Sequence, residues 1–229
     1  MAVKKASLPA LVFFFFISAS QLLGFSTPVF SPAAAESADG KSGDYAKLEK
    51  EILREMNLAR TDPGQYSSFL RNFKKLYRGR EIRFPGRVVA ATREGAGAVD
   101  EAIGDLSARK PVPPLAYSRG LSLAARDLVR EQGVSGETGH GAGEGMTAEA
   151  RAGRYGKWRR KLGENISYGM DNARLIVMML IIDDGVSDRG HRKNIFDPAY
   201  GAAGVSCGPH PSFRTVCVMD LAGAFTENK

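Results

Sequence analysis

Histidine and acidic residues in three glycine-containing turns are the side chains of this sequence best suited to chemistry. His140 lies in GVSGETGHGAGEGMT, Glu164 in KLGENISYG and His191 in SDRGHRKNIFDP. Two neutral imidazoles and a carboxylate can bind Zn²⁺ at about 2.0–2.2 Å and leave a fourth position open. Turns beside rigid elements are also where function is usually found. Further polar residues lie in or beside these turns: Glu144, Asp183, Asp184 and Ser187.

A hydrolase is the second interpretation of the same residues. Ser187 lies four residues before His191, and Asp183 or Asp184 could complete a Ser-His-Asp triad. However, Ser187 lacks the GxSxG context of a nucleophile elbow, and no HExxH segment supplies the helix-borne ligands of a zinc hydrolase. The third interpretation is structural, because a buried histidine and glutamate can satisfy each other's hydrogen bonds and hold loops together. Residue types alone leave a binding site, a hydrolase and a structural cluster open.

Periodicity predicts mostly helices first and strands last. This order indicates an α+β domain rather than a parallel βαβ fold. Asp44, Thr147 and Asn172 are expected to cap helices. The run NARLIVMMLIID is expected to be a buried helix because it is rich in Met and Leu. Helices are expected at 44–61, 63–70, 94–108, 118–133, 147–156 and 172–183, and strands at 161–169, 200–210 and 213–225.

Residues 1–35 are expected to be a secretory signal peptide. Two lysines precede the apolar run LPALVFFFFISASQLLGF, and the small residues of SPAAAES follow, with cleavage expected after Ala35. A membrane anchor is the competing interpretation, because a span needs about 20 apolar residues. The alanine-rich exit favours cleavage, so the protein is expected to be secreted or to reside in the periplasm or cell envelope. Residues 36–44 are expected to be a flexible linker and 45–229 one domain.

Charge restricts the classes of partner. The chain has 32 Lys and Arg against 25 Asp and Glu, and without the two lysines of the expected signal peptide the net charge is +5. An excess of this size favours adhesion to anionic wall polymers or lipid headgroups. Only the Arg-rich segment 71–93 and WRRK at 158–161 would support nucleic-acid binding, which we do not expect. We predict that 71–93 is a solvated basic loop, with a patch for an acidic partner as the alternative.

The two cysteines are expected to form a disulfide. Cys207 and Cys217 are the only cysteines, and they flank GPHPSF, which has turn composition. An even cysteine count in an exported chain favours a bridge over two free thiols. Closing so short a loop stabilises the fold by roughly 2–3 kcal/mol in the chain-entropy model.

Two long stretches resemble a known family. GHGAGEGMTAEARAGRYGKWRRKLGENISYG and DDGVSDRGHRKNIFDPAYGAAGVSCG resemble the centre of the CAP superfamily, which includes cysteine-rich secretory proteins, insect venom allergens and plant pathogenesis-related proteins of group 1. The sequence is most similar to the bacterial SCP-like extracellular branch. The resemblance extends roughly from Tyr45 to Phe225. Its most specific parts are GENI at 163–166 and GHRKNI at 190–195, in this order and spacing.

The resemblance implies a three-layer α-β-α sandwich with a central antiparallel sheet, and a cleft lined by two histidines and two acids. His140 and His191 match the two histidines, and Glu164 matches the acid of the GEN motif. Residues 172–182 contain no acid, so Asp183 and Asp184 are the nearest candidates for the fourth position. We expect the ring of His191 to meet His140 and Glu164 across a groove, with Arg192 and Lys193 exposed and pointing away.

The function expected from the resemblance is that of a secreted, monomeric, non-catalytic binding module. Its ligand would be a small hydrophobic molecule, a lipid or a cell-envelope component. No cofactor is required, but weak binding of Zn²⁺ or another divalent cation is expected at His140 and His191, with Glu164 as a further ligand.

Overall fold

The computed structural model describes residues 38–84, 89–141 and 147–228, without the side chains of 38–43 and Val89. The expected signal peptide and Glu144 lie outside this part of the chain. Along the described residues the elements are α1 Ala38–Thr61, α2 Pro63–Lys74, β1 Tyr77–Arg78, β2 Glu81–Arg83, β3 Val89–Ala91, α3 Ala96–Ala108, β4 Ala116–Tyr117, α4 Arg119–Ser135, α5 Ala148–Tyr155, β5 Gly156–Tyr168, α6 Ala173–Ile182, α7 Gly190–Phe196, β6 Ala202–His210 and β7 Arg214–Glu227.

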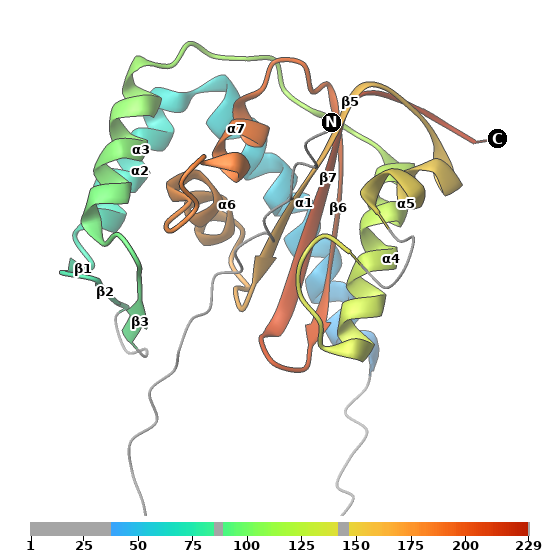
Figure 1. Ribbon diagram of the computed structural model, residues 1–229, viewed down its shortest axis with the longest axis horizontal. Helices are drawn as coiled ribbons and strands as arrows, with labels where there is room; N and C mark the ends of the chain where they lie inside the picture. Colours follow the sequence, from blue (N-terminus) through green and yellow to red (C-terminus); the bar gives the residue numbers. More distant parts are fainter. Residues whose placement is uncertain (1–37, 85–88, 142–146, 229) are drawn as a thin grey trace, which may run out of the picture.

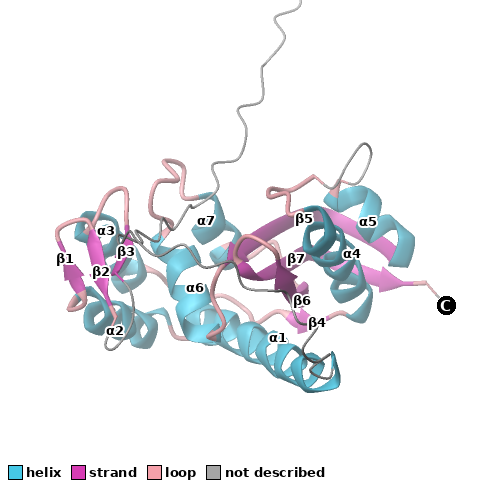
Figure 2. Ribbon diagram, turned by 90° about the horizontal axis from the view of Figure 1, so that it is seen from below, coloured by secondary structure: helices cyan, strands magenta, loops and turns pink. Residues whose placement is uncertain are grey.

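A four-stranded sheet forms the middle of three layers, with strand order β4-β6-β7-β5. Strands β5, β7 and β6 are antiparallel, and only the two-residue β4 runs parallel to its neighbour. Helices α4 and α5 cover one face, whereas α1, α6 and α7 cover the other (Figures 1 and 2). The predicted α+β sandwich is therefore confirmed.

Apolar side chains fill the spaces between these layers. The larger cluster lies between the sheet and α1 and α6 and continues outward to α2 and α3, with Ile52, Ile181 and Met219 fully buried. Smaller clusters lie under α4 and α5. Helix α6 has the sequence ARLIVMMLII and is buried on nearly all sides, which is typical of a helix without a polar face.

Several predicted boundaries are confirmed by capping contacts. Asn172 accepts a hydrogen bond from the Leu175 amide at the start of α6, and Thr147 does so from Ala150 at the start of α5. In contrast, Asp44 caps nothing, because α1 already begins at Ala38. The helix thus enters the segment 36–44. The predicted linker there stays a prediction, since nothing is described before residue 38.

The prediction of a solvated loop over 71–93 is wrong for the described residues. Helix α2 continues to Lys74, and β1, β2 and β3 then form a small antiparallel sheet. Tyr77 and Ile82 are buried, whereas Arg78 and Arg83 beside them are exposed. Alternation of this kind matches the side-chain period of a strand, but the many cations obscured it in the sequence.

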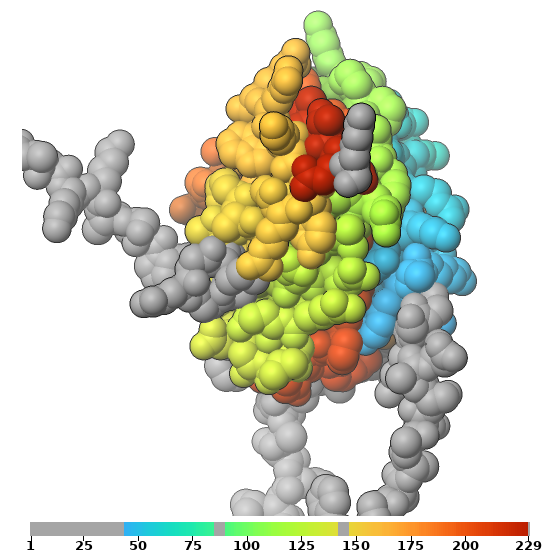
Figure 3. All heavy atoms as spheres, turned by 90° about the vertical axis from the view of Figure 1, so that its right-hand side faces the viewer, coloured from blue at the N-terminus to red at the C-terminus, as the bar shows by residue number. Residues whose placement is uncertain are grey.

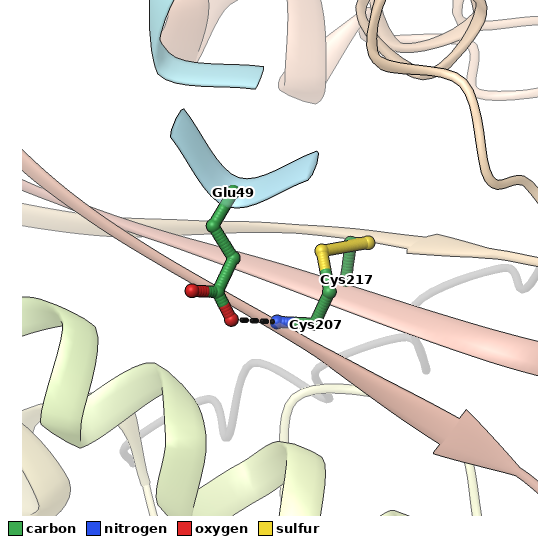
Figure 4. The surroundings of a disulfide bond; sticks show 3 residues. All are labelled: Glu49, Cys207 and Cys217. Carbon is green, nitrogen blue, oxygen red and sulfur yellow. Dashed lines mark hydrogen bonds between the residues drawn. A yellow bond between two sulfur atoms is a disulfide. The ribbon is translucent and has the colours of Figure 1, made fainter. Parts of the chain in front are cut away.

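The disulfide joins β6 to β7 at directly opposed positions. Cys207 and Cys217 are register partners with Cα atoms 4.1 Å apart, and the predicted bridge between them is formed. On the outer side of β6, the Cys207 amide donates to Glu49 Oε1 from α1 at 2.8 Å (Figure 4). Burial raises the pKa of Glu49. The Val205 amide donates to Ser122 Oγ in the same way.

Candidate functional site

Glu164 joins a surface histidine to a buried arginine. The carboxylate is almost fully buried, and its Oε1 lies 2.8 Å from His140 Nδ1. Its Oε2 accepts from Arg151 Nη2, whose side chain is fully buried in α5. Both oxygens of Glu164 are therefore engaged, and Arg151 also donates to the His140 carbonyl. The predicted pairing of His140 with Glu164 is present, with 43% of the His140 side chain exposed.

Hydrogen bonds from the sheet and α4 hold the loop that carries His140. The Tyr168 hydroxyl accepts from the Gly139 amide and donates to Gln132 Oε1, while Gln132 Nε2 donates to the Gly139 carbonyl. His210 Nε2 lies 3.0 Å from the Glu137 carbonyl, and its Nδ1 accepts from two backbone amides. The third histidine is thus a structural residue with a defined tautomer.

His191 is paired with Asp183 rather than with Glu164. Its Nδ1 lies 2.7 Å from Asp183 Oδ1, and its backbone amide donates to Oδ2 at 2.9 Å. Asp183 ends α6 in the left-handed region, with φ 57°, and is completely buried. The His191 side chain is 18% exposed. Because Nδ1 faces the carboxylate, a neutral imidazole carries its proton there, and among the described residues Nε2 makes no hydrogen bond.

The neighbouring acid, Asp184, has a different role. Its two oxygens accept from the amides of Arg93 and Glu94 at 2.6 and 2.7 Å. In return, Glu94 accepts from the Gly185 amide and from Arg189. The hydrogen bond from Arg189 lowers the pKa of Glu94 to about 2. These reciprocal contacts attach the His191 turn to the segment before α3, and in the described ranges Asp184 makes no hydrogen bond with a histidine ring.

Arg192 does not point into solvent as expected. It is buried and donates to the carbonyls of Ile181 and Ile182 and to Glu101. These carbonyls belong to the last turn of α6, where a cation is favourable. Only Lys193 of the two flanking cations is exposed.

The two histidine pairs lie on opposite sides of the outer strand β5. Successive side chains of a strand point to opposite faces, so Glu164 meets α5 while Asn165 meets α7. Asn165 Nδ2 donates to the His191 carbonyl, and Asn194 Nδ2 donates to the Glu164 carbonyl and to Asn165 Oδ1. The GEN motif thus holds one histidine on each side of the sheet edge.

A buried acid that sequence analysis does not select lies beside Glu164. Asp220 of β7 is the register partner of Glu164 and is fully buried. Neither of its oxygens meets a hydrogen-bond donor among the described residues. Burial first, and then the Glu164 charge, raise the pKa of Asp220 well above its ordinary range. A protonated Asp220 could donate a hydrogen bond to the Glu164 carboxylate.

These contacts determine which side-chain atoms are available as ligands for a metal ion. Within the described ranges, no group of three or more His, Cys, Asp and Glu side chains is arranged to hold one. His140 and His191 can each offer Nε2, since their Nδ1 atoms face carboxylates, an arrangement known to support metal-ligating histidines. Both Glu164 oxygens already accept hydrogen bonds. Metal binding therefore stays a prediction, carried by the two imidazoles.

Ser187 is not positioned as the nucleophile of a triad. It is exposed, and in the described part of the chain it makes no hydrogen bond with His191. The Asp183–His191 pair has two of the three members of a triad, but a serine within reach of the second ring nitrogen is also required.

Similarity to known proteins identifies the family of this chain. Two solved structures are similar: an extracellular SCP-domain protein from Bacillus anthracis (18% identity, TM-score 0.40, covering 48% of this chain and 34% of that chain), and a cysteine-rich secretory protein from Staphylococcus aureus (16%, 0.37, 49% and 33%). The chain thus matches about a third of the length of either protein. No curated protein matches it. The model of the cysteine-rich secretory protein family, CAP, matches residues 53–221, so the chain is a member of the CAP family.

Proposed function

We propose that this chain is an exported, non-catalytic binding module in which His140 and His191 contact the ligand. One observation supports this most directly: each imidazole is held through Nδ1 by a buried carboxylate, while part of its ring is exposed. A carboxylate in this position fixes the tautomer and orientation of the ring and leaves Nε2 for an outside partner. A histidine serving only to join loops would have no need of an exposed second nitrogen.

The ligand class follows from family membership and from the predicted export. We propose a small ligand, a lipid or a cell-envelope component, with weak binding of a divalent cation at the imidazoles of His140 and His191. A metal held this way would polarise a ligand oxygen as a Lewis acid. The chain's own residues orient the rings, and Arg151 holds the Glu164 carboxylate in place. A hydrolase is less well supported, because Ser187 is exposed and makes no hydrogen bond with His191 among the described residues.

Calorimetric titration of the purified protein with Zn²⁺ tests the metal component. The wild-type protein should release heat with an affinity weaker than that of a structural zinc site. The double variant His140→Ala, His191→Ala should show none. Lys193→Ala is the matched control, because it removes an exposed side chain two residues from His191 and should titrate like the wild type. Identical traces for the wild type and the double variant would end the metal proposal.

The variant His191→Gln separates a binding site from a purely structural cluster. Glutamine keeps a donor that can reach Asp183 but removes the second imidazole nitrogen. We expect Tm to fall by no more than about 4 °C, equivalent to about 1 kcal/mol in a domain of this size, together with loss of the zinc heat. A much larger fall in Tm would instead favour the structural interpretation. Mass spectrometry of molecules copurifying with the native exported protein would identify the ligand itself.

A further inference from the structure

The first half of β5 is a strongly basic strip that the histidine site does not use. Lys157, Trp158, Arg159, Arg160 and Lys161 are five consecutive exposed residues. β5 is the last strand of the sheet, so one of its edges has no neighbouring strand. In Figure 1 the start of β5 runs beside the end of β7 at the upper right, near α5. Figure 3 shows this face of the molecule.

Among the described residues, most cations of this strip have no ion-pair partner. Lys161 pairs with Asp197 at 2.5 Å. By contrast, Lys157, Arg159 and Arg160 make no side-chain hydrogen bond or ion pair in the described part of the structure. The acid nearest in register, Glu227, already accepts from Ser118 Oγ and the Gly120 amide.

A backbone irregularity lies among these cations. The register of β5 against β7 shifts between Arg159 and Leu162, and Arg160 has φ 70°. A bulge inserts an extra residue into a strand and redirects its side chains. A left-handed conformation at a residue other than glycine is uncommon. Here it accompanies two adjacent exposed arginines, where a regular strand would turn one toward each face.

An aromatic residue at the water boundary lies among the cations. Trp158 is the only tryptophan of the chain, and it is 37% exposed. Tryptophan prefers the membrane–water interface, where its apolar ring and polar N–H are both satisfied. Lysine and arginine beside it are attracted to anionic headgroups. Single-stranded nucleic acid would instead need a groove with several aromatic platforms, and a soluble polyanion would need no tryptophan.

We propose that Lys157–Lys161 form a docking surface for an anionic phospholipid bilayer, separate from the histidine site. Binding is peripheral, salt-sensitive and weak, since it depends on three uncompensated cations and one aromatic ring. Glu164 lies five positions after Arg159, at most about 16 Å at 3.3 Å per residue. Docking would therefore bring the histidine pairs close to the membrane surface without placing them in it.

Fluorescence of the single tryptophan tests the proposal directly, because Trp158 lies within the strip. Vesicles containing phosphatidylglycerol should shift its emission to shorter wavelength and protect it from acrylamide quenching. Vesicles of phosphatidylcholine alone should do neither, and 0.5 M NaCl should reverse the effect. Unchanged emission with phosphatidylglycerol vesicles would overturn the proposal. So would an equal shift with soluble polyphosphate, which would identify a general polyanion site.

Two double variants with the same change in charge test whether vesicles bind at this strip. Arg159→Gln, Arg160→Gln should lower vesicle partitioning roughly 30-fold, from about 1 kcal/mol per cation near an anionic surface. Lys110→Gln, Arg130→Gln makes the same charge change at exposed residues elsewhere and should retain most binding. Equal losses in both variants would overturn the assignment to this strip. His140→Ala, His191→Ala should still bind vesicles, so the result is independent of the histidine-site proposal.

Discussion

The carboxylate of Glu164 connects two environments that differ in their access to water. One oxygen meets an imidazole that is partly exposed, and the other meets a guanidinium with no exposure at all. Beside them Asp220 adds a second buried acid. Two carboxylates and one arginine cannot all be charged at low cost away from water. The group is therefore expected to retain a proton on Asp220 in the folded protein.

Replacing Asp220 with asparagine should reveal this proton. Asn is neutral and can donate to Glu164, as protonated Asp220 would. Because the pKa of Asp220 is raised on folding, its contribution to stability is greatest below the unfolded value of about 3.9 and is lost as pH rises toward the folded value. Urea unfolding from pH 3.5 to 8 should show Asp220→Asn gaining stability relative to the wild type as pH increases.

A loss of stability in Asp220→Asn at high pH would contradict this prediction. If Asp220 were charged and paired with Arg151, the variant would leave a buried cation less compensated and lose about 3–5 kcal/mol at pH 8. Glu137→Gln is a suitable control, since its side chain is exposed and only its carbonyl accepts from His210.

Sequence reasoning found the residues of the site that lie in turns and missed those inside regular elements. His140, Glu164 and His191 could be selected from the sequence because each lies in a glycine-containing turn, where functional residues are often found. Arg151 is an ordinary cation on a short helix, and cations are rarely fully buried. The choice of Asp183 over Asp184 depends on the turn that ends α6, which adjacent acids in a sequence cannot reveal.

At the level of elements, helix α4 and strand β6 approach each other so closely that position 204 of β6 requires glycine. A Cβ at Gly204 would overlap the backbone of Leu121 and Ser122 in α4. Since α4 precedes the loop that carries His140, its distance from the sheet also determines where that loop lies. Tight packing of this kind cannot relax by moving a flexible side chain.

Gly204→Ala should therefore destabilise the protein by about 1–3 kcal/mol, the usual range for overpacking. Gly104→Ala is the matched control with the opposite sign. A Cβ at Gly104 meets nothing within 4 Å, and alanine stabilises a helix interior by roughly 1 kcal/mol over glycine. Chemical unfolding of the two variants measures both effects. A Gly204→Ala protein as stable as the wild type would show that α4 can move outward freely.

Elements with strong local signals were predicted well, and those that depend on distant contacts were not. Helix α6 has an apolar sequence and an asparagine cap, and β6 and β7 alternate on either side of a turn. The strands β1, β2 and β3 have two or three residues each. Such short strands are stabilised by pairing and by burying Tyr77 and Ile82, which local propensity cannot indicate.

Across the whole molecule, the disulfide connects the two central strands beneath α1. Reduction should lower Tm by about 5–10 °C, since a loop of this length contributes about 2–3 kcal/mol at 2–4 °C per kcal/mol. Thermal unfolding with and without reductant measures this, with Cys207→Ser, Cys217→Ser as an irreversibly open reference. An unchanged Tm, with reduction confirmed by mass, would contradict the prediction.

None of the helices in the described ranges is long and apolar enough to cross a membrane. The bilayer contact proposed for Lys157–Lys161 is peripheral and uses exposed side chains of β5.

The outer side of β6 has a consequence for self-association. Glu49 and Ser122 already accept from the amides of Cys207 and Val205. A second copy approaching this edge would find these donors occupied and would have to displace an acid from α1 to pair with them. Side chains from two helices thus act as a cover that discourages sheet extension, and concentrated solutions should resist fibre formation through this strand.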